Sequence, residues 1–167
     1  INPHTFWLFS FVRNPWSRIV SRFEHLKGVL IDDKNLNINK PERRDFGCYF
    51  RHYNLEENIK NYCFNKFIKF ITFKYNAHWE MQFYQIANRV KGIDKVNFIG
   101  KIENFQEDFD IVCDKIGIPR QKLPHHNKSK HKHYTEYYDA ETRQIVAETY
   151  KQDIEQFGYE FGECGEK

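Results

Sequence analysis

The sequence predicts an α/β domain of three layers, in which many helices flank a parallel sheet. Segment 6–12 is apolar on both faces except at Ser10, which is typical of a parallel strand that helices cover on both sides. A second short strand is expected over 95–100. With 167 residues and 40% apolar content, the chain is long enough to bury a core of its own, so a single domain over 1–167 is expected.

The first expected helix, 15–26, carries two start signals. Asn14 is a good N-cap, and Pro15 suits the first helical position. The stretch after this helix is polar and irregular, which predicts a surface excursion over 27–62.

Apolar residues recur at helical spacing in the second half of the chain. Gly117 and Pro119 are expected to end one of these helices, and Asp139 to cap the last one. The segment 120–133 between those two helices is expected to be a basic loop. The spacing predicts helices over about 64–75, 83–90, 102–116 and 140–157.

Composition excludes several classes of protein. A net charge of +3 suits an anionic partner but lies far below the charge density of a nucleic-acid binder. The four cysteines are far apart and form no CxxC pair, so zinc is not expected, and reduced core thiols are favoured over a disulfide. We find no signal peptide and no run of ~18 apolar residues, so no transmembrane segment is expected. These absences favour the cytoplasm, although a luminal domain without its anchor would look the same.

Positive charge gathers where the first strand passes into the first helix. Ligands of open α/β sheets bind beyond the carboxyl ends of the strands, where helix N-termini present N–H groups. The guanidinium of Arg13 could grip a phosphate there through two parallel hydrogen bonds, and the Ser21 hydroxyl could reach a second oxygen. Arg18 and Arg22 add positive potential in other directions. Alternatively, Arg13 pairs with a carboxylate and Ser21 only packs against a neighbour.

The residues of this strand–helix junction resemble a motif of a known family. "FVRNPWSRIVSRF" (11–23) resembles the 3′-phosphate-binding motif of the carbohydrate sulfotransferase superfamily, and Arg13 and Ser21 match its arginine and serine. The resemblance implies a P-loop-NTPase-like sulfotransferase fold and 3′-phosphoadenosine 5′-phosphosulfate as the sulfuryl donor, without a metal. It continues in order through "AHWEMQ" (77–82), "NFIGKIENFQEDFD" (97–110) and "LPHHNKSKHKHYTEYYDAETRQIVAETYKQDIEQFGYEF" (123–161).

The sequence departs from the family pattern at one point. Members of the family carry a phosphosulfate-binding loop, with a lysine, upstream of the 3′-phosphate motif. The chain has no such glycine-rich or Pro-Lys-Thr turn and begins at Ile1 rather than Met. We therefore expect an N-terminally incomplete domain, and the activity of this piece alone is an open question.

Sulfuryl transfer to a hydroxyl needs a base for the acceptor's proton. His78 in "AHWEMQ" is the best internal candidate, because the adjacent Trp79 could form an acceptor-binding wall; its alternative role is a hydrogen bond that holds the fold. The acceptor itself is expected to be a carbohydrate or another hydroxyl compound, bound near the 27–62 excursion. Glu103, after the second strand, could orient Arg13 or Arg18, and capping of the following helix is the favoured role.

The basic loop 120–133 allows more than one interpretation. Its resemblance to the family's C-terminal block favours a lid over the donor phosphates, in which Lys128, Ser129 and Lys130 make the contacts. A solvated loop or a site for anionic acceptor sugars are the alternatives. The loop also holds four histidines, but adjacent lysines would repel a metal cation.

Two other classes of function compete with sulfuryl transfer. A non-catalytic binder of RNA or sulfated glycan would use stacking aromatics interleaved with arginines, whereas the aromatics here fall at helical core positions. A phosphoryl-transfer enzyme would need a Walker lysine and a carboxylate that holds magnesium, and the sequence offers neither.

Overall fold

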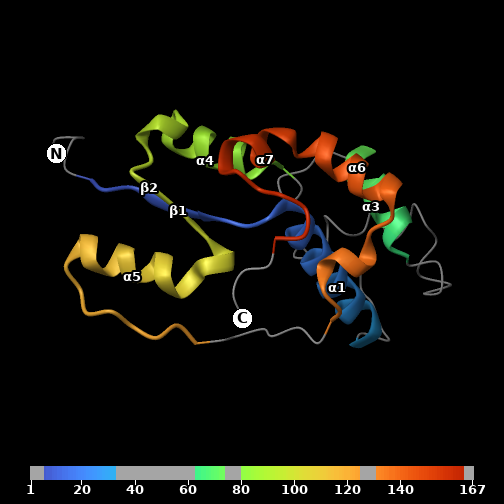
Figure 1. Ribbon diagram of the computed structural model, residues 1–167, viewed down its shortest axis with the longest axis horizontal. Coiled ribbons are helices and arrows are strands. Elements are labelled where there is room, and N and C mark those ends of the chain that lie inside the picture. The colour runs from blue at the N-terminus through green and yellow to red at the C-terminus, as the bar shows by residue number, and fades with distance from the viewer. Residues whose placement is uncertain (1–5, 33–62, 74–79, 125–130, 164–167) are drawn as a thin grey trace.

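Two short parallel strands lie among helices in the computed structural model, which describes residues 6–32, 63–73, 80–124 and 131–163 (Figure 1). β1 (Phe9–Val12) pairs with β2 (Phe98–Lys101), so the carboxyl ends of both strands meet at one edge. This parallel pairing and the abundance of helix agree with the predicted α/β class. Within these ranges the α-helices are α1 (Pro15–Asp32), α3 (Phe64–Phe73), α4 (Gln82–Val90), α5 (Phe105–Ile116), α6 (Ala140–Thr149) and α7 (Lys151–Phe157).

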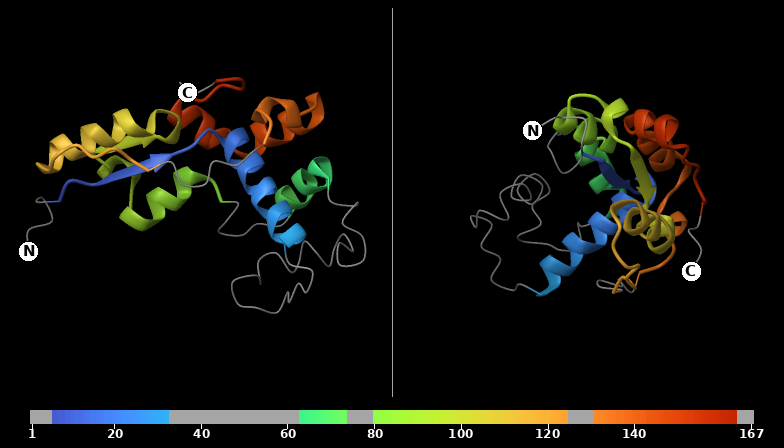
Figure 2. Two further views of the ribbon diagram at one scale, coloured as in Figure 1. Left: turned by 90° about the horizontal axis from the view of Figure 1, so that it is seen from below. Right: turned by 90° about the vertical axis from the view of Figure 1, so that its left-hand side faces the viewer.

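Helices α4 and α5 lie on opposite faces of the strand pair (Figures 1 and 2). On one face, Phe11 meets Phe105 of α5 edge-on, with ring centroids 4.9 Å apart. On the other, Phe83 and Ile86 of α4 pack with the buried residue Val12. The carboxyl end of β1 is therefore enclosed, and this end leads into α1.

The predicted strand 6–12 is shorter and less covered than expected. β1 begins at Phe9, and the side chains of Phe6 and Phe9 are 63% and 44% exposed. A hollow of about 330 Å³ between β1 and α4 runs along residues 8–11, so α4 does not pack closely over this part of the strand. The expectation of helices packed over both faces therefore holds only near Val12.

Helix α1 starts where predicted but runs six residues beyond the expected end at 26, to Asp32. Residues 27–32, assigned to the surface excursion, are therefore helical, and residues 33–62 lie outside the described part. The buried face of α1 packs against α3 and α6, with Phe23 and Phe64 edge-on at 5.2 Å. This main core contains Trp16, Ile19, Val20, Phe23, Leu26, Phe64, Phe67, Ile68, Phe70, Ile71, Tyr134, Val146 and Tyr150.

The last predicted helix, 140–157, is two helices. Tyr150 departs from helical geometry (φ −111°, ψ 24°) and separates α6 from α7. The break lets the two helices serve two cores. Val146 and Tyr150 face the α1–α3 core, whereas Phe157 packs against Val12 beside the strands.

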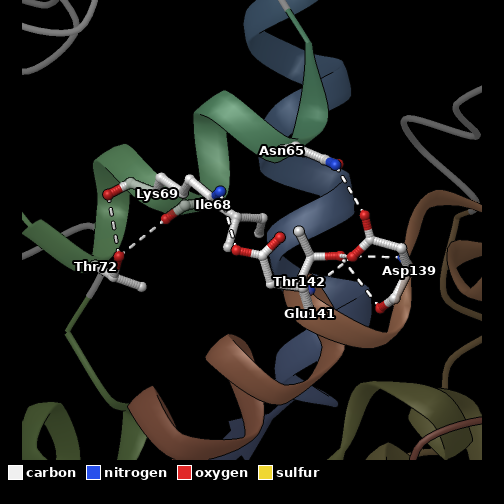
Figure 3. A network of polar contacts seen from close by, with 7 residues as sticks. All are labelled: Asn65, Ile68, Lys69, Thr72, Asp139, Glu141 and Thr142. Carbon is white, nitrogen blue, oxygen red and sulfur yellow. Dashed lines mark hydrogen bonds and ion pairs between the residues drawn. The ribbon is translucent and has the colours of Figure 1, made fainter.

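Polar contacts fasten α3 to the start of α6 (Figure 3). Asp139 caps α6, since its Oδ1 accepts hydrogen bonds from the Thr142 backbone N–H (2.7 Å) and hydroxyl (2.6 Å). Its Oδ2 accepts a hydrogen bond from the side chain of Asn65 (2.8 Å). Lys69 and Glu141 form an exposed ion pair beside it. The predicted cap is confirmed, and it also ties two helices together.

Helix α5 ends as the sequence predicts. Gly117 adopts a left-handed conformation (φ 77°), and its N–H donates to the carbonyl oxygen of Cys113. Cys113 is a buried free thiol, whereas Cys63 is exposed. None of the helices in the described ranges combines the length and apolar character needed to cross a membrane.

The Asp139 cap predicts a specific pH dependence of stability. Hydrogen bonds from Thr142 lower the pKa of Asp139 from its ordinary value of 3.8. The ionised cap therefore stabilises the fold above that value, and this contribution is lost as the pH falls through the lowered pKa. Asp139→Asn should lower the melting temperature at pH 7, and the difference from wild type should shrink toward pH 3 in circular dichroism melts. Asp94→Asn, an exposed aspartate elsewhere, is the control; a pH-independent difference for Asp139→Asn would contradict this account.

Candidate functional site

The turn between β1 and α1 is held by buried polar contacts. Asn14 is fully buried, and its side-chain oxygen accepts hydrogen bonds from the backbone N–H groups of Trp16 (3.1 Å) and Ser17 (3.3 Å). This geometry confirms Asn14 as the N-cap of α1. The Asn14 side-chain amide donates to the carbonyl oxygen of Glu160 (3.0 Å), which anchors the C-terminal segment to the same turn.

The backbone of Arg13 is clamped by a side chain from α4. The Arg13 N–H donates to Oε1 of Gln82 (2.8 Å), and Nε2 of Gln82 donates to the Arg13 carbonyl oxygen (2.7 Å). Arg13 lies between the last residue of β1 and the cap of α1. Gln82 therefore pairs both backbone groups of a residue that belongs to neither element.

Asp153 of α7 holds Gln82 in turn. Its carboxylate is fully buried and accepts hydrogen bonds from the backbone N–H groups of Gln82 and Phe83, both at 2.8 Å. The first turn of α4 is thus capped by an aspartate 70 residues further along the chain. Burial raises the pKa of Asp153, and the N–H donors act in the opposite direction.

The side chain of Arg13 lies along the first turn of α1. Its Nε donates to the hydroxyl of Ser17 (3.1 Å). Ser17 and Ser21 lie one turn apart on α1, so their hydroxyls share one side of the helix. Arg13 is half-buried, and burial lowers the pKa of its guanidinium while Glu103 raises it. An arginine keeps its charge under such shifts, so the site is cationic at neutral pH.

The sequence favoured Glu103 as the cap of the helix after β2, but the structure gives it another role. Its Oε1 accepts a hydrogen bond from the Asn14 N–H (2.7 Å), and its Oε2 accepts one from the hydroxyl of Tyr159 (3.2 Å). The reason is the parallel register, which places Val12 opposite Lys101 and so brings both strand ends together. Glu103 therefore supports the β1–α1 turn, close enough to influence Arg13 electrostatically.

Arg18 points away from this turn. Its Nη1 donates to the carbonyl oxygen of Glu80 (2.9 Å), and its side chain lines the hollow between β1 and α4. Arg89 of α4 lines the same hollow. The positive charge of Arg18 therefore acts on a different surface from that of Arg13, in keeping with the different directions expected from the sequence.

Arg13 and Ser21 are the predicted site residues that the structure places. Arg13, in the β1–α1 turn, and Ser21, on α1, are both half-buried. The alternative in which Arg13 pairs directly with a carboxylate is not the hydrogen bonding found, because its Nε donates to a hydroxyl. The predicted base and the predicted lid contacts lie outside the described residues, so their roles stay predictions: His78, Lys128, Ser129 and Lys130.

Sequence reasoning missed the residues that support Arg13. Ser17 carries a detectable signal, since a hydroxyl at i+4 can reach the arginine. Gln82 and Asp153 lie inside segments that carry the family resemblance, yet no spacing rule connects them with Arg13. Only the folded chain brings these residues together.

Comparisons with known proteins bear on the family of the chain. The model of the sulfotransferase family matches residues 2–160. An uncharacterized protein of Archaeoglobus fulgidus is 31% identical over 114 residues, which span 68% of this chain and 70% of that protein. No solved structure matches the chain.

Replacement of the buried cap Asn14 should destabilise the fold much more than replacement of the exposed Asn104. Asn14→Ala removes two hydrogen bonds at the helix start and leaves the Glu160 carbonyl oxygen without its donor. It should lower the free energy of unfolding by about 2 kcal/mol in urea titrations. Asn104 is the matched control, because it is exposed and stands at the N-cap of α5 without a side-chain cap bond. Equal losses for Asn14→Ala and Asn104→Ala would refute the assigned role.

Proposed function

Because this chain belongs to the sulfotransferase family, we propose that it transfers a sulfuryl group from 3′-phosphoadenosine 5′-phosphosulfate to a hydroxyl of a carbohydrate-like acceptor. The observation that carries this proposal is the position of Arg13 at the carboxyl edge of the parallel strands, where its Nε is hydrogen-bonded to Ser17 at the start of α1. This is the edge at which α/β proteins bind phosphorylated ligands.

Arg13 would bind the 3′-phosphate of the donor. Its guanidinium donates a hydrogen bond to a neutral hydroxyl, and this contact does not neutralise its positive charge. A bidentate arginine–phosphate contact is among the strong charge-assisted hydrogen bonds. Ser21 would then supply a neutral donor to another oxygen of the same phosphate.

The basic loop would approach this site along α1. At its described end, His131 and Lys132 line a hollow of about 420 Å³ together with Glu24 and Lys27 of α1. Glu24 is one turn beyond Ser21. This placement supports a lid over the donor, with Lys128, Ser129 and Lys130 as its proposed contacts.

The reaction would exchange one sulfur–oxygen bond for another. The bond from sulfur to the phosphate oxygen breaks, sulfur bonds to the acceptor oxygen, and adenosine 3′,5′-bisphosphate leaves. The acceptor's proton passes to a base, for which His78 is the proposed residue. The three-layer P-loop-NTPase-like architecture over 1–167 and an acceptor site near 27–62 belong to the same proposal.

A nucleotide titration tests the donor site. Calorimetry should show tighter binding of adenosine 3′,5′-bisphosphate than of adenosine 5′-monophosphate. Arg13→Ala should weaken the bisphosphate by about 100-fold, roughly the loss of one charged hydrogen-bonding group, and leave the monophosphate unchanged.

Lys115→Ala is the control for general charge, because Lys115 is exposed in the last turn of α5, outside the basic loop. It should leave both affinities unchanged. Equal affinities of the wild type for the two nucleotides would reject a 3′-phosphate site and favour a non-specific polyanion binder.

A further inference from the structure

We propose that Gln82 and Asp153 are positioning residues for Arg13, so that affinity for the 3′-phosphate depends on the contact between α4 and α7. This inference rests on the proposed function. It assigns a role in ligand selection to two residues that would not touch the ligand themselves.

The first step is the two-point clamp on the Arg13 peptide. A side chain leaves its backbone in a direction that the flanking peptide groups set. Gln82 binds both the N–H and the carbonyl oxygen of Arg13, at 2.8 and 2.7 Å. Rotation of this backbone would break both bonds at once. The clamp therefore fixes where the guanidinium leaves the β1–α1 turn.

The second step is the orientation of Gln82. Its backbone N–H donates to Asp153 at 2.8 Å, and its Nε2 lies 3.4 Å from the same oxygen, Oδ2. Each Asp153 oxygen accepts a backbone N–H, so Oδ2 acts as an acceptor and selects the amide orientation in which Nε2 faces it. Both side chains are buried, where hydrogen bonds are hard to replace by water. Asp153 therefore locks the Gln82 amide in the orientation that Arg13 requires.

The third step separates positioning from simple stabilisation. A residue that only stabilises the fold changes the melting temperature and leaves the ratio of two ligand affinities intact. A residue that positions Arg13 changes the affinity for the ligand that Arg13 binds. Adenosine 3′,5′-bisphosphate and adenosine 5′-monophosphate differ only in the 3′-phosphate, so the ratio of their affinities reports on the Arg13 contact.

The chain offers a matched control for the clamp. Asn97 pairs both backbone groups of Leu8 before the opposite end of β1. Its Oδ1 accepts the Leu8 N–H (2.8 Å), and its own N–H donates to the Leu8 carbonyl oxygen (2.8 Å). Asn97 is exposed and contacts no residue of the β1–α1 turn through these bonds. Asn97→Ala removes a side-chain bond to the backbone without affecting Arg13.

The experiment measures both nucleotide affinities by calorimetry, at a temperature at which each variant is folded by circular dichroism. Gln82→Ala should weaken the bisphosphate by about tenfold, as loss of a supporting partner does in comparable sites, and leave the monophosphate unchanged. Asp153→Asn should reduce the same ratio, and Asn97→Ala should keep it within twofold. Gln82→Met, which keeps the side-chain length, replaces Gln82→Ala should that variant not fold.

The two proposals fail in distinguishable ways. If the folded Gln82 and Asp153 variants keep the wild-type selectivity while Arg13→Ala loses it, the positioning role is wrong. The donor site is then still supported. Equal affinities in the wild type would overturn the donor site and the positioning role together. A similar loss in Asn97→Ala would show that any side-chain bond to the backbone has this effect, which also contradicts the inference.

Discussion

The clamp of Gln82 on the Arg13 peptide is the contact on which the β1–α1 turn depends. A strand that passes directly into a helix leaves one residue whose backbone groups belong to neither element, and these groups need partners once they are buried. Gln82 supplies both partners, and Asp153 fixes Gln82. One residue of the turn thereby connects β1, α4 and α7, which lie far apart along the chain.

The carboxylates around this turn are satisfied mainly by backbone N–H groups and a hydroxyl. Asp153 accepts from the first turn of α4, and Glu103 accepts from the Asn14 N–H and the Tyr159 hydroxyl. A buried carboxylate held in this way has its acceptor capacity used without a direct ion pair. The guanidinium of Arg13 is hydrogen-bonded to Ser17 instead, which suits a residue that binds an anionic ligand.

Much of the local structure follows from short sequence signals. Asn14 and Pro15 start α1, Asp139 starts α6, and Gly117 ends α5, because each residue type satisfies or relieves backbone groups within its own turn. The same kind of reasoning extended the last helix through Tyr150. The helix breaks there because its two halves pack into two separate cores. A local pattern of apolar residues does not distinguish these two cores.

The sequence by itself determined the family, the parallel α/β class and the cation at position 13, since these rest on residue types and their order. The tertiary structure decided what holds that cation. Glu103 was expected at a neighbouring helix start and instead supports Asn14 across the strand ends. Gln82 and Asp153 meet Arg13 only through packing of α4 and α7, because hydrogen bonds between distant segments depend on register and helix placement, which spacing along one chain does not encode.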